Sequence, residues 1–107
     1  MPKPVRLRRL AADDVEAAVD HLLAEATAGD AARFVDSVER ALGRVGRQPL
    51  SGSLRFSYEL DMPELRSWPL TGFPYLVFYV EHDREIDVWL TLHTRRDIPS
   101  TVADHET

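Results

Sequence analysis

The sequence predicts an α+β domain in which a short N-terminal strand precedes an antiparallel helical hairpin, and the hairpin packs on an antiparallel sheet of three or four strands. Two observations carry this prediction. Apolar residues recur with helical spacing over residues 13–45, and they alternate with the two-residue spacing of strands over residues 64–93. The predicted order is therefore β-α-α-β-β-β. At 107 residues we expect one domain, 1–107, with a core over 4–99 and a tail over 100–107.

The first strand and the first helix follow from the N-terminal quarter of the chain. Val5 and Leu7 alternate with arginines, which predicts a short strand over residues 4–9 with one face in solvent. The helix that follows is predicted to end at Gly29, because glycine adopts the left-handed conformation at little cost. Its apolar stripe has the spacing i, i+3, i+4, i+7, i+8, i+11 and consists of Val15, Ala18, Val19, Leu22, Leu23 and Ala26.

The second helix is predicted to begin with Asp30 as its N-cap and to end at Gly46 and Pro49. Because so few residues separate the two helices, they must turn back on each other as an antiparallel hairpin. The stripe of the second helix consists of Phe34, Val35, Val38, Ala41, Leu42 and Val45.

The rest of the chain predicts a connection and three strands. Residues 50–63 are irregular and predict a surface connection with a brief strand around residues 54–58. Strands are predicted over 64–70, 73–82 and 86–93. The second is apolar on both faces and belongs in the middle of the sheet. One face carries Leu76, Phe78 and Val80, and the other Tyr75, Val77 and Tyr79. The third strand is half-buried, because its apolar residues alternate with more polar ones. The apolar residues are Ile86, Val88, Leu90 and Leu92.

Composition excludes several classes of protein. An apolar share of 44% and a charged share of 29% are typical of a globular domain. The absence of cysteine excludes disulfides and thiolate metal sites, and no two histidines have the spacing of metal ligands, so we expect no metal and no cofactor. The longest apolar run, residues 75–80, is too short to span a membrane. The first ten residues have no apolar stretch of signal-peptide length. We therefore expect a cytoplasmic protein without a membrane partner.

The net charge of −5 arises in the C-terminal part of the chain. Residues 1–60 carry nine basic and nine acidic residues, whereas residues 61–107 carry four arginines and nine carboxylates. Nucleic-acid binding depends on neutralising phosphates, so we expect no stable nucleic-acid binding. A partner segment should instead contain some basic residues.

Three stretches resemble the ParE/RelE superfamily of small toxins from type II toxin–antitoxin modules. They are the hairpin over residues 13–45, the strand ELRSWPL, and the run PYLVFYVEHDREIDVWLTLHTRRDIP. ParE-like chains show a Leu-Arg-Ser strand, a strand ending in Phe-Tyr, and a final His-x-x-Arg-Asp-Ile/Leu-Pro signature. These motifs stand here at residues 65–67, 78–79 and 93–99, and the resemblance covers residues 5–99.

The resemblance implies a growth-inhibiting toxin that acts by binding and poisoning DNA gyrase. A cognate ParD-like antitoxin would neutralise it in a hetero-oligomer, and the toxin would not be an enzyme. RelE-like relatives instead cut messenger RNA in the ribosomal A site, so a ribosome-dependent endoribonuclease remains an alternative. The residue types for that chemistry are present as Tyr79, His93, Arg95 and Arg96. A disarmed toxin, retained as an antitoxin-binding relic, is a third reading.

The candidates for target binding are Arg66, His93, Arg95 and Arg96. His93 would either contact the target or hydrogen-bond the turn that follows it. Adjacent residues of an extended segment point to opposite sides, so one of the two neighbouring arginines should brace the fold and the other face outward. For Arg66, an ion pair at the edge of the core and a functional contact are equally compatible with the sequence.

The candidates for antitoxin binding lie on the two helical stripes and on the central strand. An antitoxin segment that folds on binding would dock as a helix in a groove or as an added strand. The candidate residues are Val15, Val19, Leu22, Phe34, Val38 and Tyr75. We assign no catalytic and no metal-binding residue.

Overall fold

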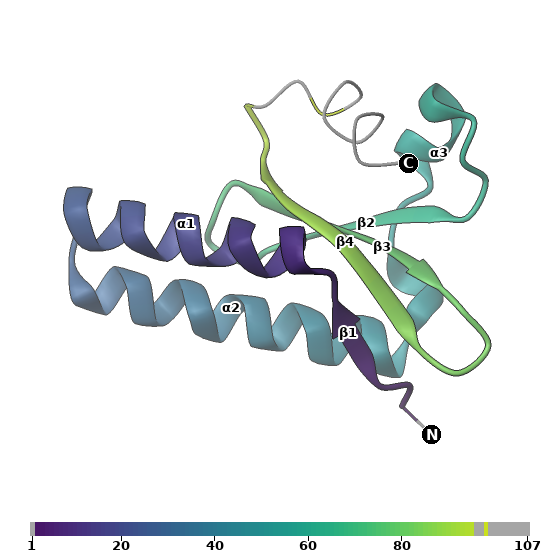
Figure 1. Cartoon of the computed structure of the whole chain (residues 1–107), viewed down its shortest axis with the longest axis horizontal. Coiled ribbons are helices and arrows are strands. Elements are labelled where there is room, and N and C mark those ends of the chain that lie inside the picture. Colours follow the sequence, from purple (N-terminus) through teal and green to yellow (C-terminus); the bar gives the residue numbers. More distant parts are fainter. Residues whose placement is uncertain (1, 96–97, 99–107) are drawn as a thin grey trace.

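A computed structural model describes residues 2–95 and 98, and contains a four-stranded sheet with two long helices on one face (Figure 1). The predicted α+β class and element order are confirmed. The predicted tail, residues 100–107, lies outside the described residues. In chain order the elements are β1 (Val5–Leu7), α1 (Arg9–Glu25), α2 (Ala28–Arg47), the 3-10 helix η1 (Pro49–Ser51), α3 (Arg55–Leu60), β2 (Leu65–Pro69), β3 (Tyr75–Glu81) and β4 (Ile86–His93).

The sheet has the strand order β1-β4-β3-β2, so β3 lies in its interior as predicted. Strands β2, β3 and β4 form an antiparallel meander. Strand β1 joins β4 in parallel, with Val5 opposite Ile86 and Leu7 opposite Val88. The strand that is first in the sequence and the strand that is last are therefore neighbours (Figure 1).

A β-bulge in β4 changes which side chains face the helices. Phe78 pairs with Leu90 while Tyr79 pairs with Val88, so Trp89 is the extra residue. An extra residue reverses the alternation of faces beyond it. Ile86 and Val88 consequently face the helices, whereas Leu90 and Leu92 face the opposite side of the sheet. The uninterrupted alternation predicted over residues 86–93 is wrong beyond the bulge.

Two apolar clusters cover the two faces of the sheet. Fully burying one large aliphatic side chain contributes about 1.5–3 kcal/mol, so both clusters stabilise the fold. The first cluster, between helices and sheet, consists of Ala11, Ala18, Phe34, Val38, Ala41, Val45, Leu70, Val77, Tyr79, Ile86 and Val88. The second, on the opposite face and partly under α3, consists of Phe56, Leu65, Phe78, Val80, Leu90, Leu92 and Ile98.

The turn between α1 and α2 differs from the prediction. The N-cap of α2 is Thr27, not Asp30, and Gly29 lies in the first turn of α2 instead of ending α1. The Thr27 hydroxyl accepts from the amide of Asp30 at 3.0 Å, and the Asp30 carboxylate accepts from the amide of Thr27 at 3.2 Å. This reciprocal capping box satisfies two amides that would otherwise lack partners.

The connection between α2 and β2 contains a helix where we predicted a brief strand. Residues 54–58 do not form a strand, and α3 occupies most of that stretch. Phe56 is buried and Tyr58 is 86% exposed. A strand would have placed both on one face, whereas a helix turns them apart. Within the described residues no helix is both long enough and apolar enough to span a membrane.

Candidate functional site

The exit of β4 carries His93 and Arg95 in a tight turn. The amide of Arg95 donates to Nδ1 of His93 at 3.0 Å. The half-buried His93 ring meets Tyr75 edge-on, with ring centroids 5.1 Å apart. His93 thus makes the turn hydrogen bond expected of a structural histidine, while Arg95 is exposed. Arg96 lies outside the described residues, and with it the predicted division of roles between the two arginines.

Arg66 lies on β2 and its guanidinium binds backbone. Its Nη1 donates to the carbonyl oxygen of Gly52 at 2.8 Å and to that of Leu50 at 3.3 Å. Among the described residues Arg66 has no carboxylate within 4 Å. Of the two alternatives for Arg66, the ion pair at the core edge is not formed with any described residue, and the guanidinium instead makes two contacts that hold the connection after α2.

Arg66 and His93 do not belong to one site. Arg66 pairs with Tyr79 on β3, and His93 pairs with Tyr75 on the same strand. Four residues of extended chain separate these two positions, which is roughly 13 Å along the strand. The two candidates also lie on opposite sides of β3, on β2 and on β4. A target that contacts both must span the sheet.

Tyr79 is fully buried and its hydroxyl has two partners. It donates to the carbonyl oxygen of Pro49 at 2.6 Å and accepts from the amide of Gly52 at 2.9 Å. Burial raises the pKa of Tyr79, and the hydrogen bond from Gly52 and the charge of Arg66 offset this only in part. The phenol therefore remains protonated at neutral pH and has no access to solvent.

This arrangement does not suit metal-free RNA cleavage. That reaction needs a base, an acid and a cation within hydrogen-bond reach of one reacting group. Tyr79 is buried beneath the helices, whereas His93 and Arg95 lie at the far end of β4. The described members of the predicted set, Tyr79, His93 and Arg95, therefore do not converge on one reaction centre.

The antitoxin-binding candidates divide by burial. Phe34 and Val38 are at most 6% exposed and belong to the core beneath the hairpin, so they present no surface to a partner. The other four candidates are half-buried at the margin of the same core, namely Val15, Val19, Leu22 and Tyr75. The stripes chosen from periodicity are mainly the contact between helices and sheet.

The exposed apolar side chains of the hairpin are different ones. Leu10, Leu23 and Val35 are 48%, 53% and 37% exposed. Leu23 follows Leu22, and Val35 follows Phe34. Successive helical residues point about 100° apart, so one member of each pair turns outward. Two consecutive apolar residues in a helix are therefore the feature of the sequence that indicates exposed apolar surface on the hairpin. In Figure 1 the closed end of the hairpin projects beyond the sheet.

A charged cluster joins β1 and α1 to β4. The Arg8 guanidinium makes two hydrogen bonds to the buried Asp87 carboxylate, at 3.1 and 2.9 Å. His82 Nε2 lies 3.3 Å from the same carboxylate, and Arg8 lies 4.4 Å from the ring centroid of Trp89. Burial alone would raise the pKa of Asp87, but the hydrogen bonds from Arg8 and His82 outweigh it and hold that pKa below its ordinary value.

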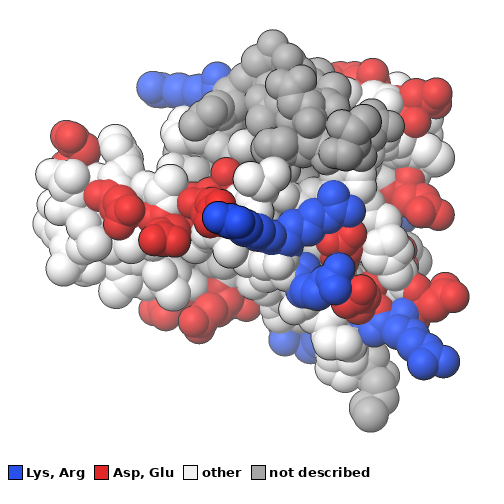
Figure 2. Space-filling model, viewed as in Figure 1, with Lys and Arg blue, Asp and Glu red and all other residues white. Residues whose placement is uncertain are grey.

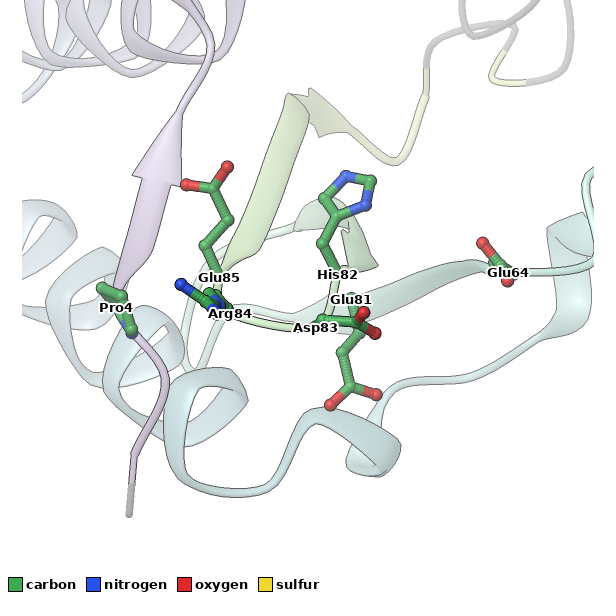
Figure 3. A pocket seen from close by; sticks show the side chains of 7 residues that line it. All are labelled: Pro4, Glu64, Glu81, His82, Asp83, Arg84 and Glu85. Atoms are coloured by element: carbon green, nitrogen blue, oxygen red, sulfur yellow. The ribbon is translucent and has the colours of Figure 1, made fainter.

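An open hollow of about 560 Å³ lies at the turn between β3 and β4 (Figure 3). Lys3 binds two of its lining residues, donating from Nζ to Glu81 at 2.8 Å and to the carbonyl oxygen of His82 at 2.7 Å. In the described part of the chain no group of three or more His, Asp or Glu residues is placed to hold a metal ion. The residues that line the hollow are Pro4, Glu64, Glu81, His82, Asp83, Arg84 and Glu85.

Charge is unevenly distributed on the face shown in Figure 2. Acidic side chains lie along α1, and basic side chains gather where β1 meets α1. Several of these basic residues are paired: Arg6 lies 3.9 Å from Glu85, and Arg9 lies 3.9 Å from Asp13. The length of α1 is therefore one acidic part of this face, suited to a partner with basic residues.

Comparison with known proteins gives a family match and similar solved structures. Residues 5–98 match the family described as ParE toxin of type II toxin–antitoxin system, parDE. A solved structure, described as the chromosomal ParDE toxin–antitoxin system from P. aeruginosa, has a similar fold, with a TM-score of 0.71 and 20% sequence identity over 85% of this chain and 95% of that chain. No curated protein sequence matches the chain.

Proposed function

Because this chain belongs to the ParE toxin family of type II toxin–antitoxin systems, we propose that it inhibits growth by binding DNA gyrase and poisoning it. At the family level ParE toxins are generally non-enzymatic gyrase poisons. In this chain the observation that favours binding over catalysis is the burial of Tyr79, whose hydroxyl is occupied by Pro49 and Gly52. The phenol has no route to a substrate.

The proposed contact with the target lies at the exit of β4. Arg95 is exposed there, and the hydrogen bond between its amide and His93 fixes the turn that presents it. A guanidinium in this position can bind a carboxylate or a phosphate with two parallel hydrogen bonds. Arg96 remains a candidate of the same kind, and Arg66 is a candidate for a more distant part of the interface.

The proposed neutralising partner is a ParD-like antitoxin that binds the toxin in a cytoplasmic hetero-oligomer. Leu23 and Val35 give the hairpin exposed apolar surface for an amphipathic segment. The carboxylates along α1 favour a segment that also carries basic residues (Figure 2). Half-buried Val19 and Leu22 would extend this contact at its inner margin.

Induction of the chain alone in a bacterial host tests this proposal. Viability, the DNA-damage response and transcript integrity are scored together. Growth arrest with DNA damage and intact transcripts is the expected result. Arrest with cleaved transcripts and undamaged DNA would favour the ribosome-dependent RNase, and unimpaired growth would favour a disarmed relic.

A supercoiling assay with purified gyrase then tests the target directly. The wild-type chain should inhibit supercoiling, and Arg95→Gln should weaken inhibition. The matched control is Arg55→Gln, which removes another exposed arginine far along the chain from the β4 exit. Equal inhibition by all three proteins would count against the contact at Arg95, and no inhibition by any would count against gyrase.

A further inference from the structure

The outward face of α2 carries three arginines in its C-terminal half. Arg40, Arg44 and Arg47 are exposed and have the spacing i, i+4, i+7, which places them on one side of the helix. Among the described residues none of the three has a carboxylate oxygen within 4 Å. In an acidic protein these are cations left available to another molecule.

Three exposed arginines elsewhere in the chain are paired. Arg6 has Glu85 as a partner, Arg9 has Asp13, and Arg33 has Asp30. Arg55, Arg84 and Arg95 are also exposed, and none of them has a carboxylate within 4 Å among the described residues. What distinguishes α2 is that three such cations lie on one side of one helix.

The absence of a side chain at position 43 lets the guanidinium of Arg47 lie close to the helix. Gly43 lies between Arg40 and Arg47 on the same face, and a Cβ atom there would lie 3.1 Å from Nη1 of Arg47. The glycine leaves room for a shallow hollow of about 440 Å³. Asp36 and Glu39 also line this hollow.

Aromatic and apolar groups adjoin the cations. The guanidinium of Arg44 lies 5.3 Å from the ring centroid of Trp68 on β2. Leu50, in the 3-10 helix directly after α2, is 70% exposed. Protein interfaces are enriched in arginine and aromatic residues, and an exposed leucine beside them adds apolar area to bury.

The helix dipole does not account for this group. Cations near a helix C-terminus are favoured by the carbonyl end of the dipole, but the effect falls off within the last turn. Arg44 and Arg47 are in the last turn of α2, whereas Arg40 lies about two turns from its end. The dipole also gives no reason for an exposed leucine.

We propose that the α2 arginine face, defined as Arg40, Arg44, Arg47 and Leu50, docks an acidic protein segment that carries an apolar side chain. The chain as a whole has a net charge of −5 and so favours basic partners, whereas this face favours an acidic one. Asp36 and Glu39 beside the arginines disfavour a continuous polyanion such as nucleic acid. This interface is separate from the antitoxin and target contacts proposed above.

Fluorescence anisotropy with the full chain tests the proposal. The probe is a fluorescein-labelled peptide of glutamate, aspartate and leucine. A labelled single-stranded oligonucleotide represents the alternative class of ligand, nucleic acid. The triple variant Arg40→Gln, Arg44→Gln, Arg47→Gln should bind the peptide about tenfold more weakly, since each exposed charge contact contributes about 0.5 kcal/mol. Leu50→Ser should weaken binding with little change in its salt dependence.

The matched control removes three paired arginines, with Arg6→Gln, Arg9→Gln and Arg33→Gln. It has the same net charge as the test variant and should bind like the wild type. The variant Arg40→Gln, Arg47→Gln keeps the contact between Arg44 and Trp68, so it gives a reading even if the triple variant is unstable. Equal weakening by both triple variants, tighter binding of the oligonucleotide, or no binding of the acidic peptide would overturn the proposal.

Discussion

The hydroxyl of Tyr79 accepts a hydrogen bond from the amide of Gly52 at 2.9 Å. The same hydroxyl donates to Pro49, so the central strand of the sheet holds the connection after α2 at two points. A Cβ atom at position 52 would lie only 2.4 Å from that hydroxyl oxygen and 2.9 Å from Cβ of Arg66. Residue 52 therefore has no space for a side chain.

Gly52→Ala should lower the free energy of unfolding by about 1–3 kcal/mol, because the new methyl group forces the connection away from Tyr79. Denaturant unfolding measures the loss. The matched control is Gly29→Ala in the first turn of α2, where a Cβ atom would meet its nearest neighbours at 3.6 Å. Equal stability of the two variants would show that the contact at Gly52 relaxes freely.

Removing the Tyr79 hydroxyl should change the pH dependence of stability. The folded chain holds this proton more tightly than the unfolded chain, because burial raises the pKa of Tyr79. The resulting stabilisation is present below the unfolded pKa of about 10 and is lost as the pH rises above it. Urea unfolding from neutral to alkaline pH should therefore show a steeper loss in the wild type than in Tyr79→Phe. Tyr58→Phe, at an exposed position, should behave like the wild type.

Asp87→Asn should destabilise the protein by about 2 kcal/mol at neutral pH. It breaks a buried pair, but the Arg8 side chain is 42% exposed, so the loss is smaller than for a fully buried pair. The folded pKa of Asp87 is lowered, so its contribution is present above the unfolded pKa of about 3.9 and is lost as the pH falls through the folded value. The variant and the wild type should therefore converge in acid. Asp13→Asn, which affects an exposed pair, should change stability by less than about 0.5 kcal/mol.

Substitutions at Leu23 and Phe34 should separate the effect on antitoxin binding from the effect on stability. Leu23→Ser should weaken binding of a purified antitoxin about tenfold, since burial of a leucine contributes about 1.5–3 kcal/mol, while the free energy of unfolding changes little. Phe34→Ala should cost about 3–5 kcal/mol of stability, because it leaves a cavity in the core. Calorimetric titration and denaturant unfolding provide the two readouts. An unchanged affinity in Leu23→Ser would place the antitoxin elsewhere.

Substitutions of Arg95 and His93 should likewise separate target binding from stability at the β4 exit. Arg95→Gln should reduce growth arrest and leave thermal unfolding unchanged, because the side chain is exposed. His93→Ala should lower stability by about 1 kcal/mol, because it removes the acceptor of the Arg95 amide. Growth arrest that survives Arg95→Gln at wild-type expression would remove this residue from the target contact.

Much of the fold could be predicted because local periodicity determines it. The stripes of α1 and α2 and the two apolar faces of β3 are visible in single segments. The bulge at Trp89 has no local signature, since apolar alternation continues through it in the sequence. The parallel pairing of Val5 with Ile86 likewise depends on a contact between distant segments. The sequence contains the Thr27–Asp30 spacing of a capping box, but Asp30 is also a residue type that fits an N-cap, so the sequence alone does not decide between the two.

The candidate site was less predictable because residue type does not reveal burial. His93 and Arg95 were found from a motif, and the turn hydrogen bond between them fits one of the two predicted roles of His93. Phe34 and Val38 were assigned to a partner although the core contains them. Their neighbour Val35 is the exposed one. Periodicity shows which face of a helix is apolar. Only the packed fold shows which residues of that face the sheet buries and which stay exposed.

The pairing of β1 with β4 constrains when the protein can fold. Val5 leaves the ribosome well before its partner Ile86 has been synthesised. Contacts between residues so far apart in sequence form slowly, because a large loop must close first. A nascent chain that lacks β4 also lacks Ile86 and Val88 of the core beneath the hairpin. The domain thus reaches its assembled state only after β4 has been synthesised, so translation products that stop before β4 remain without that state.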